Sequence, residues 1–418
     1  MKGEILIPQE VSQVTKILKN AGFKAFLVGG CVRDLIVGNK PKDWDITTNA
    51  TPEEIIGLFP KTVYENAFGT VAVIHETSDD ETVKSIEITP FRLEGAYSDN
   101  RHPDSVQFSQ NIEDDLKRRD FTMNAIALDS KGQIVDLYKG QEDIKDRIIK
   151  AVGNPTERFE EDALRMLRAV RFAVQLGFTI EKETEMALLK NSHHIKNVSV
   201  ERIRDEFTKI IVSREPGQGI RMLHRFGLLQ YIVPELEEGD GVEQKGEHIY
   251  DVFEHILHAL EHAAQKDKQF DIRLSALFHD IGKPRTRRWD GTKAGGAGKY
   301  TFYGHEVIGA RMVRKIMERL KFSRETSEKV EKLVRHHMFF SDTEQITLSA
   351  VRRTIVNVGR ENIWDLMEVR ECDRVGMKKK EAPYRLRKYH AMIEEALRAP
   401  TSVGMLKIDG AALMELGI

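Results

Sequence analysis

Cysteine is scarce in this sequence, because only Cys31 and Cys372 occur among its 418 residues. Two cysteines so far apart form no disulfide framework, and they lack the close spacing of a thiolate metal site. Long apolar runs are missing too: no stretch of about 18 apolar residues is present, and the first 20 residues carry no apolar signal core. These absences predict a soluble protein of a reducing compartment, the cytoplasm, that does not interact with membranes.

An excess of one charge is missing as well. The chain has 64 Lys and Arg against 66 Asp and Glu, which gives a formal net charge of -2. A nucleic-acid ligand would therefore have to bind at local basic patches. With 40% hydrophobic residues, a chain of this length is expected to form about two to four domains with buried cores.

The spacing of apolar residues separates a mixed N-terminal part from a helical remainder. A helical pattern at 11–21 precedes predicted strands at 26–28, 44–47, 70–76 and 83–91. Predicted helices then follow at 161–175, 183–190, 200–212 and 217–226. The acidic segment 235–246 breaks this pattern and is typical of a linker. The sequence therefore predicts an α+β fold, with a small mixed sheet in an N-terminal head and all-α regions after it.

The most informative motif lies near the N-terminus. Gly29 and Gly30 end an apolar run, Arg33 follows, and Asp43 and Asp45 come after a short turn. Glycines lack a Cβ, so backbone N–H groups there can approach phosphates. Residues two apart on a strand point to the same side, so the two aspartates can present carboxylates to a pair of Mg²⁺ ions. This order predicts a metal-dependent phosphoryl-transfer site.

Glu87, on the predicted strand 83–91, is the candidate for a third metal-binding carboxylate. Strand alternation turns it away from the side that Ile86 and Ile88 face. An exposed strand glutamate gives the same pattern, so both interpretations stay open.

Four further motifs follow the first in a fixed order. They are RRDFTMNA at 118–125, DLYKG at 136–140, EDALR at 161–165, and Glu201-Arg202 with Glu206. With these motifs the chain resembles the tRNA nucleotidyltransferases, the CCA-adding enzymes of the bacterial and eukaryotic class in the DNA polymerase beta superfamily. The resemblance implies a polymerase-beta-like head that adds CCA to the tRNA 3′ end from CTP and ATP with Mg²⁺. Bacterial poly(A) polymerases share this head, and A-adding or CC-adding enzymes also remain alternatives.

The resemblance also implies which residues bind the nucleotide. They come from the first motif, from the RRD and EDALR motifs and from the segment that follows: Gly29, Gly30, Arg33, Arg119, Asp120, Asn124, Asp162, Arg165, Arg168 and Arg171.

Asp162 and Arg165 lie three residues apart in the predicted helix and would share one face. A carboxylate that accepts from the amino group of C or A, beside a guanidinium that donates to the ring, would reject U and G. The alternative is a surface ion pair between Glu161 and Arg165.

A second constellation lies in the helical part. His255, His279-Asp280 and Asp373 follow the ligand order of the HD phosphohydrolases, and ALFHDIGK at 276–283 resembles that family. Imidazoles with carboxylates suit Mn²⁺, Ni²⁺, Fe²⁺ or Mg²⁺ better than a thiolate zinc site does. Three more histidines are candidates for a second ion, or else are core or surface residues: His305, His336 and His337.

Three other segments are polar or basic. Residues 94–106 resemble the flexible loop of complete CCA-adding and A-adding enzymes, with Glu94, Asp99 and Arg101 as its contact residues. The basic segments 284–299 and 374–388 are either RNA contacts or solvated charges. Residues 405–418 resemble the start of a tail that continues further in the family.

The predicted domains are a catalytic head at 1–150, a helical neck and body at 151–234 with nucleotide-selecting and tRNA-binding residues, an HD phosphohydrolase domain at 247–376, and a helical tRNA-binding tail at 377–418 that is either short or truncated. An HD phosphodiesterase or phosphatase whose head only recruits RNA is an alternative of another class. The intact Asp43 and Asp45 argue against it.

Overall fold

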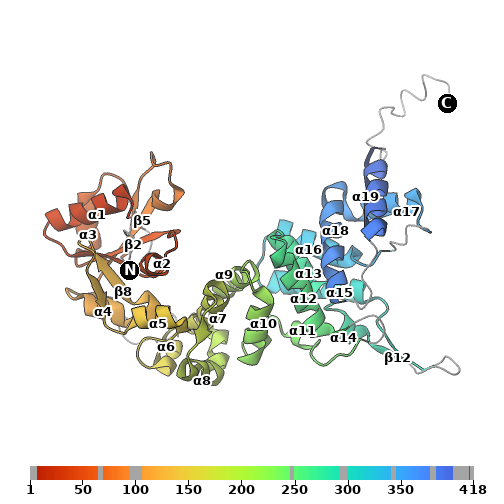
Figure 1. Ribbon diagram of the computed structural model, residues 1–418, viewed down its shortest axis with the longest axis horizontal. Helices are drawn as coiled ribbons and strands as arrows, with labels where there is room; N and C mark the ends of the chain where they lie inside the picture. Colours follow the sequence, from red (N-terminus) through yellow and green to blue (C-terminus); the bar gives the residue numbers. More distant parts are fainter. Residues whose placement is uncertain are drawn as a thin grey trace. The chain divides into compact units, whose positions relative to one another are not determined.

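The computed structural model describes residues 7–64, 69–94, 106–244, 249–291, 299–339, 345–376 and 383–398, together with Met414. The chain splits into two compact units, Met1–Ser199 and Val200–Ile418, and Figure 1 colours their elements along the sequence. Asp99 and Arg101, expected in a flexible loop, lie outside the described residues, and only the backbone of Glu94 is described. The expected fold class, a head with a small mixed sheet followed by helical regions, is confirmed. Within the described ranges, each helix is too short or too polar to cross a membrane.

A seven-stranded mixed sheet is the centre of the first unit, with the order β3-β4-β5-β2-β1-β8-β9. The strands are β1 Ala25–Val28, β2 Trp44–Thr48, β3 Thr62–Tyr64, β4 Val71–Ile74, β5 Ser85–Pro90, β8 Ile126–Asp129 and β9 Ile134–Asp136. β2 and β5 are parallel, and the other neighbours are antiparallel. A parallel pair needs a crossover, which α3 (Pro52–Leu58), β3 and β4 supply. Thr51 and Glu54 form a capping box that starts α3.

The other elements of the first unit surround this sheet or follow it. Its helices are α1 Gln9–Asn20, α2 Gly30–Val37, α4 Ile112–Lys117, α5 Gly140–Asp146, α6 Pro155–Glu161, α7 Leu164–Leu176 and α8 Lys182–Asn191, with 3-10 turns η1 Glu81–Val83, η2 Thr122–Asn124 and η3 Ser192–Asn197. Two small sheets pair β6 Arg92–Glu94 with β7 Val106–Phe108, and β10 Ile148–Ile149 with β11 Thr179–Ile180. α1 buries Val11, Val14 and Leu18, the spacing of a helix that packs one face on a core.

The predicted helix at 161–175 is wrong at its start. α6 ends at Glu161 and α7 begins at Leu164, so Asp162 lies outside both helices with an extended backbone, φ -140°. Its Oδ1 accepts a hydrogen bond from the backbone N–H of Leu164 at 3.1 Å. Aspartate often competes with helical bonds in this way. The shared helix face expected for Asp162 and Arg165 is therefore absent.

The second unit is helical. Its helices are α9 Val200–Ile211, α10 Pro216–Arg225, α11 Pro234–Glu237, α12 Val252–Gln265, α13 Phe270–Phe278, α14 Lys283–Thr286, α15 His305–Arg319, α16 Arg324–His336, α17 Leu348–Val358, α18 Ile363–Asp373 and α19 Pro383–Arg398, with 3-10 turns η4 Leu229–Tyr231, η5 Arg360–Asn362 and η6 Arg374–Gly376. A small hairpin pairs β12 Arg288–Asp290 with β13 Lys299–Thr301. α11 occupies part of the segment predicted as a linker. α17, α18 and α19 share a buried core that includes Val351, Leu366 and Tyr389.

Candidate functional site

The register of two strands places two acidic residues of the head opposite each other. Asp45 on β2 lies opposite Glu87 on β5, and Trp44 lies opposite Ile86. Trp44 and Ile86 are buried, so strand alternation turns the two acids to the other face of the sheet. Asp45 is half-buried and Glu87 is exposed on that face. Neighbouring carboxylates that remain accessible are the oxygen ligands that Mg²⁺ prefers.

The glycines at the start of α2 lie against these acids. Gly29 has a φ of +78°, and a Cβ there would lie 3.0 Å from Arg119 Nη1 and 3.4 Å from Asp45 Oδ2. A Cβ on Gly30 would lie 3.9 Å from Asp43 Oδ1. A side chain at Gly29 would thus be strained and would crowd the acids. The structure therefore brings the glycines, both aspartates and Arg119 to one place, at the N-terminus of a helix.

Asp120 connects this place to α7. Its Oδ2 accepts from Arg168 Nε at 2.8 Å, and its Oδ1 accepts from Asn124 Nδ2 at 3.1 Å. Asn124 Oδ1 in turn accepts from Arg33 Nη1 at 2.9 Å. Burial raises the pKa of Asp120, but the charge of Arg168 and these hydrogen bonds outweigh burial and lower it to about 2. Asp120 is therefore an ionised anchor that holds other polar side chains in position.

Phe172, which belongs to none of the sequence motifs, lies among three arginines. The guanidinium carbons of Arg171, Arg33 and Arg168 lie 4.2, 5.2 and 5.3 Å from the centre of its ring. An aromatic ring at these distances attracts cations, so it helps to gather charges that would otherwise repel one another. In the sequence, only the adjacent Arg171 gave a weak indication that Phe172 contacts cations. Arg33 comes close to the ring only in the folded chain. Three gathered guanidinium groups suit a polyanion such as a triphosphate.

Arg165 is enclosed by other partners. Its guanidinium donates to Glu161 Oε2 at 2.7 Å, to the carbonyl of Arg158 at 3.1 Å and to the carbonyl of Arg118 at 2.9 Å. The ion pair with Glu161 is the alternative that the sequence left open. These bonds use three of the five N–H donors of the Arg165 guanidinium.

Asp115 holds the arginine pair of the RRD motif. Its buried carboxylate pairs with Arg118 at 2.5 Å and Arg119 at 2.9 Å. Burial raises the pKa of Asp115, but the two arginines lower it below its usual range. This pairing fixes the direction from which Arg119 approaches Gly29.

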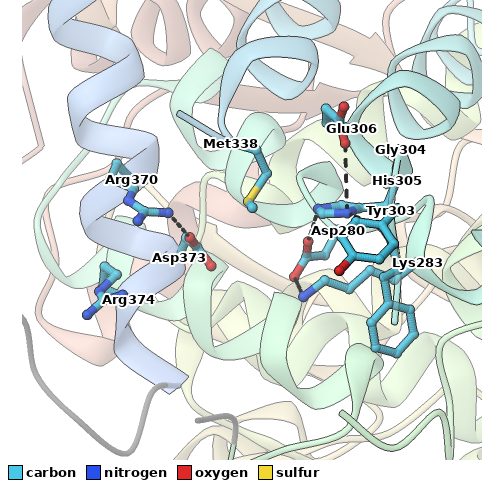
Figure 2. Close-up of a pocket in the computed structure, with 11 residues that line it drawn as sticks. Asp280, Lys283, Tyr303, Gly304, His305, Glu306, Met338, Arg370, Asp373 and Arg374 are labelled. Atoms are coloured by element: carbon cyan, nitrogen blue, oxygen red, sulfur yellow. Dashed lines mark hydrogen bonds and ion pairs between the residues drawn. The ribbon is translucent and has the colours of Figure 1, made fainter. Parts of the chain in front are cut away.

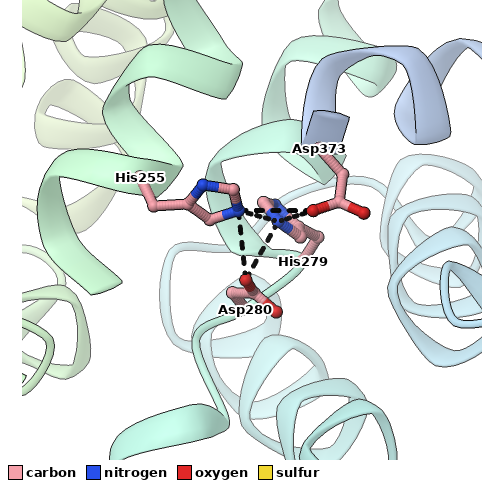
Figure 3. Close-up of side chains that lie close together, drawn as sticks. All are labelled: His255, His279, Asp280 and Asp373. Carbon is pink, nitrogen blue, oxygen red and sulfur yellow. Dashed lines mark hydrogen bonds and ion pairs between the residues drawn. The ribbon is translucent and has the colours of Figure 1, made fainter. Parts of the chain in front are cut away.

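The HD quartet meets at one buried point of the second unit (Figure 3). His255 Nε2, from α12, lies 3.1 Å from His279 Nε2 and 3.3 Å from Asp373 Oδ1. Asp280 Oδ2 lies 3.3 Å from His255 Nε2 and 3.2 Å from His279 Nε2. Two imidazole nitrogens and two carboxylate oxygens within reach of one ion suit a divalent transition metal or Mg²⁺.

A second group shares Asp280. Its other oxygen, Oδ1, lies 3.2 Å from His305 Nε2 and 3.7 Å from His337 Nε2, and these two nitrogens are 3.3 Å apart. Asp280 therefore faces both groups with one carboxylate, the arrangement of a bridging ligand between two ions. His336, the third histidine expected here, is absent from both groups of the described residues.

Backbone carbonyls orient three of these rings. Nδ1 of His279, His305 and His337 lies 2.8, 2.7 and 2.7 Å from a carbonyl oxygen three residues earlier. A bond from Nδ1–H to a carbonyl leaves Nε2 as the metal-binding nitrogen. Burial lowers the pKa of His279, but Asp280 and Asp373 outweigh it and raise the pKa to about 10, which shows how strongly this point attracts positive charge.

A cavity of about 520 Å³ opens onto the two groups. Figure 2 shows Asp280, His305 and Asp373 along it, with Lys283, Arg370 and Arg374 nearby. Lys283 Nζ lies 2.5 Å from Asp280 Oδ2, and Arg370 Nη1 lies 3.0 Å from Asp373 Oδ2. No sequence motif indicated that these cations line a pocket. Cations beside metal ligands favour an anionic substrate such as a phosphate ester.

Three families match successive parts of the chain. Residues 25–150 match the "Poly A polymerase head domain", 177–239 match the "Probable RNA and SrmB- binding site of polymerase A", and 252–375 match the "HD domain". Nucleotidyltransferase heads and HD domains generally use divalent metals, and the carboxylates and histidines described above are suitable ligands.

Known proteins similar to the chain are CCA-adding enzymes. The enzyme of Lactobacillus helveticus is 50% identical over 210 residues, which are 50% of this chain and 51% of that protein. That of Geobacillus kaustophilus is 46% identical over 220 residues, 52% of this chain and 53% of that protein. The chain thus spans about half the length of these curated relatives.

A solved structure extends the similarity to nearly the whole chain. The Bacillus stearothermophilus CCA-adding enzyme in complex with CTP is 28% identical, with a TM-score of 0.72 over 99% of this chain and 89% of that one. The chain therefore matches a poly A polymerase head, an RNA-binding region and an HD domain in that order, and its sequence and fold are similar to those of CCA-adding enzymes.

Proposed function

We propose that this chain is a tRNA nucleotidyltransferase that adds CCA to the tRNA 3′ end from CTP and ATP and releases pyrophosphate. The observation that carries the proposal is the placing of Asp45 opposite Glu87, with Asp43 and the two glycines of α2 beside them. The carboxylates suit Mg²⁺. When bound, such ions lower the pKa of the attacking hydroxyl and neutralise the leaving pyrophosphate.

The chain's own residues would bind and orient the nucleotide. Backbone N–H groups at Gly29 and Gly30 approach the triphosphate, and the guanidinium groups around Phe172 balance its charge. Asp120 and Asn124 keep two of these arginines, Arg168 and Arg33, in place. Arg119 Nη1 would lie 3.0 Å from a Cβ on Gly29, so it stands close to the turn where the phosphate is proposed to bind.

Base selection is proposed for Asp162 and Arg165. Arg165 would donate from its remaining N–H groups to the ring acceptor of C or A, while Asp162 accepts from the exocyclic amino group. U and G present a carbonyl at that point, and the mismatch of two acceptors would exclude them. The segment with Glu94, Asp99 and Arg101 is proposed to reorient Asp162 and Arg165 when the incoming nucleotide changes from CTP to ATP.

Supplying each nucleotide separately to tRNAs that end before C, after C or after CC tests the function. Complete CCA synthesis on the first acceptor is expected. Addition of A only to the CC form would indicate an A-adding enzyme, and addition of C without A would indicate a CC-adding enzyme. Homopolymer growth on unrelated RNA would instead indicate a poly(A) polymerase.

A second activity, metal-dependent phosphohydrolysis, is proposed for the HD cavity. The observation that favours it is the bridging position of Asp280 between two ligand groups. Mn²⁺, Ni²⁺, Fe²⁺ and Mg²⁺ suit this donor set, and such ions, when bound, polarise a water and the phosphate that it attacks. Lys283, Arg370 and Arg374 would orient the phosphate. His279→Ala with Asp280→Ala should remove phosphate release and leave nucleotide addition intact, and loss of addition in the folded variant would contradict independent sites.

The domain division at 1–150, 151–234, 247–376 and 377–418 is part of the proposal, as is action in the cytoplasm, where tRNA substrates are found. Limited proteolysis with mass spectrometry tests the division. Stable fragments with ends near 150, 240 and 376 are expected, and cuts inside the helices of these ranges would contradict it.

A further inference from the structure

The hairpin of β12 and β13 presents aromatic rings to solvent. Trp289 is 56% exposed, and Tyr303, just after the hairpin, is 83% exposed. Within the described residues the two strands pair only with each other. A two-stranded hairpin is marginal by itself, and large exposed aromatic side chains add little to a core. Their exposure therefore indicates an interaction surface.

The rings and cations of the hairpin are arranged in contact. Trp289 lies opposite Tyr300 in the register, with the ring centres 4.9 Å apart and the planes at 65°. The guanidinium carbon of Arg287 lies 3.7 Å over the Tyr300 ring, and Arg288 is exposed. Exposed aromatic faces beside guanidinium groups are the usual contacts of unpaired bases and the phosphates between them.

The hairpin also adjoins the HD cavity. Along the chain it lies between two residues of the metal groups, Asp280 and His305. Tyr303 and Phe302, at its end, line the cavity, as Lys283 does before it. Figure 2 shows the Tyr303 ring beside Asp280 and His305. A chain-like ligand on the hairpin would therefore have one end at the cavity.

We propose that Arg287, Trp289, Tyr300 and Tyr303 form a stacking platform for a short single-stranded RNA whose phosphate-bearing end lies in the HD cavity. The exposed Trp289 and Tyr303 rings take bases, while Arg287, which lies over the Tyr300 ring on the same face of the hairpin as Trp289, takes a phosphate between them. Lys283, Arg370 and Arg374 take the terminal phosphate. The choice of RNA and the role of the terminal phosphate rest on the proposed function, whereas stacking on the hairpin can be measured without any hydrolysis.

The test uses the full chain with Mn²⁺ and hexaribonucleotides that carry a 3′-phosphate, a 5′-phosphate or neither, each with 4-thiouridine at the terminal position. Binding is measured by fluorescence anisotropy, and irradiation followed by peptide mass spectrometry locates the contact. Wild-type protein should cross-link within residues 287–303 and bind one phosphorylated form more tightly than the unphosphorylated one. Trp289→Ala should weaken that binding by about 5- to 150-fold, the value of one lost stacking contact.

Two variants separate stacking from folding. Trp289→Phe keeps an aromatic face and should restore most of the affinity. Val356→Ala, at an apolar side chain 57% exposed on α17, should bind like wild type. Three outcomes would each overturn the platform. The first is equal affinity of wild type and Trp289→Ala for the RNA, and the second is cross-links only outside 287–303. The third is equal affinity of the wild-type protein for a mononucleotide and for the hexamer. Stacking with no phosphate release from any end would overturn the phosphohydrolase proposal and leave the platform standing.

Discussion

Asp280 is the residue whose loss should affect both metal groups of the HD unit at once. Asp280→Asn replaces a carboxylate that faces His255 and His279 with one oxygen and His305 and His337 with the other. An amide has one acceptor oxygen and no charge. The first group would keep two histidines and Asp373, and the second group would keep two histidines alone.

The structure also sets the size of the effect. Changes to residues that only orient metal ligands cost about 10- to 100-fold in affinity, so removal of a shared ligand should cost at least about 100-fold at each group. Lys283 would also lose its partner at 2.5 Å, and breaking a buried ion pair costs about 3–5 kcal/mol. Thermal unfolding must therefore accompany the metal measurement.

The assay counts Mn²⁺ per chain by mass spectrometry after dialysis against micromolar metal, with every protein carrying Asp43→Ala and Asp45→Ala so that the proposed metal ligands of the head are removed. Wild type should retain about two ions, His337→Ala about one, and Asp280→Asn fewer than one, if a carboxylate bridges two ions. Asp240→Asn is the control, because this acid has an exposed side chain outside both groups. Two ions in folded Asp280→Asn, or none in folded His337→Ala, would refute the bridging arrangement.

Four other predictions concern the head. Asp45→Asn should abolish addition of both C and A while tRNA binding changes less than about 3-fold. Glu87→Gln should raise the Mg²⁺ concentration needed for the half-maximal rate about 10-fold. A normal Mg²⁺ dependence of Glu87→Gln would remove Glu87 as a ligand. Phe172→Leu should raise the KM of CTP and ATP together by about 5-fold, from about 1 kcal/mol of cation–π attraction, with little change in kcat; an effect on one nucleotide only would contradict a role under the shared triphosphate. Because the folded pKa of Asp120 is lowered from 3.8 to about 2, it should contribute about 2 kcal/mol of stability above pH 4 that is lost as the pH falls to 2. The free energy of unfolding of Asp120→Asn, measured in urea at several pH values, should lack this part of the pH dependence, whereas the control Asp240→Asn should keep it. Identical slopes of unfolding free energy against pH in wild type and Asp120→Asn would argue against the ionised anchor.

Features that depend on local periodicity were predictable. Alternation on β2 and β5 identified the sides on which Asp45 and Glu87 lie. The HD cluster was predicted instead from the resemblance to the HD phosphohydrolases, and His255, His279, Asp280 and Asp373 do meet. Whether Glu87 faces Asp45 was open, because strand pairing is a property of the whole sheet. The register supplied that answer.

Features that depend on competition between partners were not predictable. Spacing suggested that Asp162 continues a helix, but its side chain caps Leu164 instead. Phe172 gathers arginines from two separate segments, which are far apart in the sequence. In each case the local sequence allows several partners for the side chain, and the folded structure determines which partner it contacts.

The first ligand group of the HD unit joins residues from distant parts of the chain. His255 and Asp373 are 118 residues apart in sequence, yet their side chains lie 3.3 Å apart. An ion held by both would close a loop of that length, and such closure costs the unfolded chain conformational entropy that grows with the logarithm of loop size. The ion would act as a clasp that ties α12 to α18. A chelator should then loosen the fold of the whole helical unit and expose α18 to proteases, even where no substrate is present.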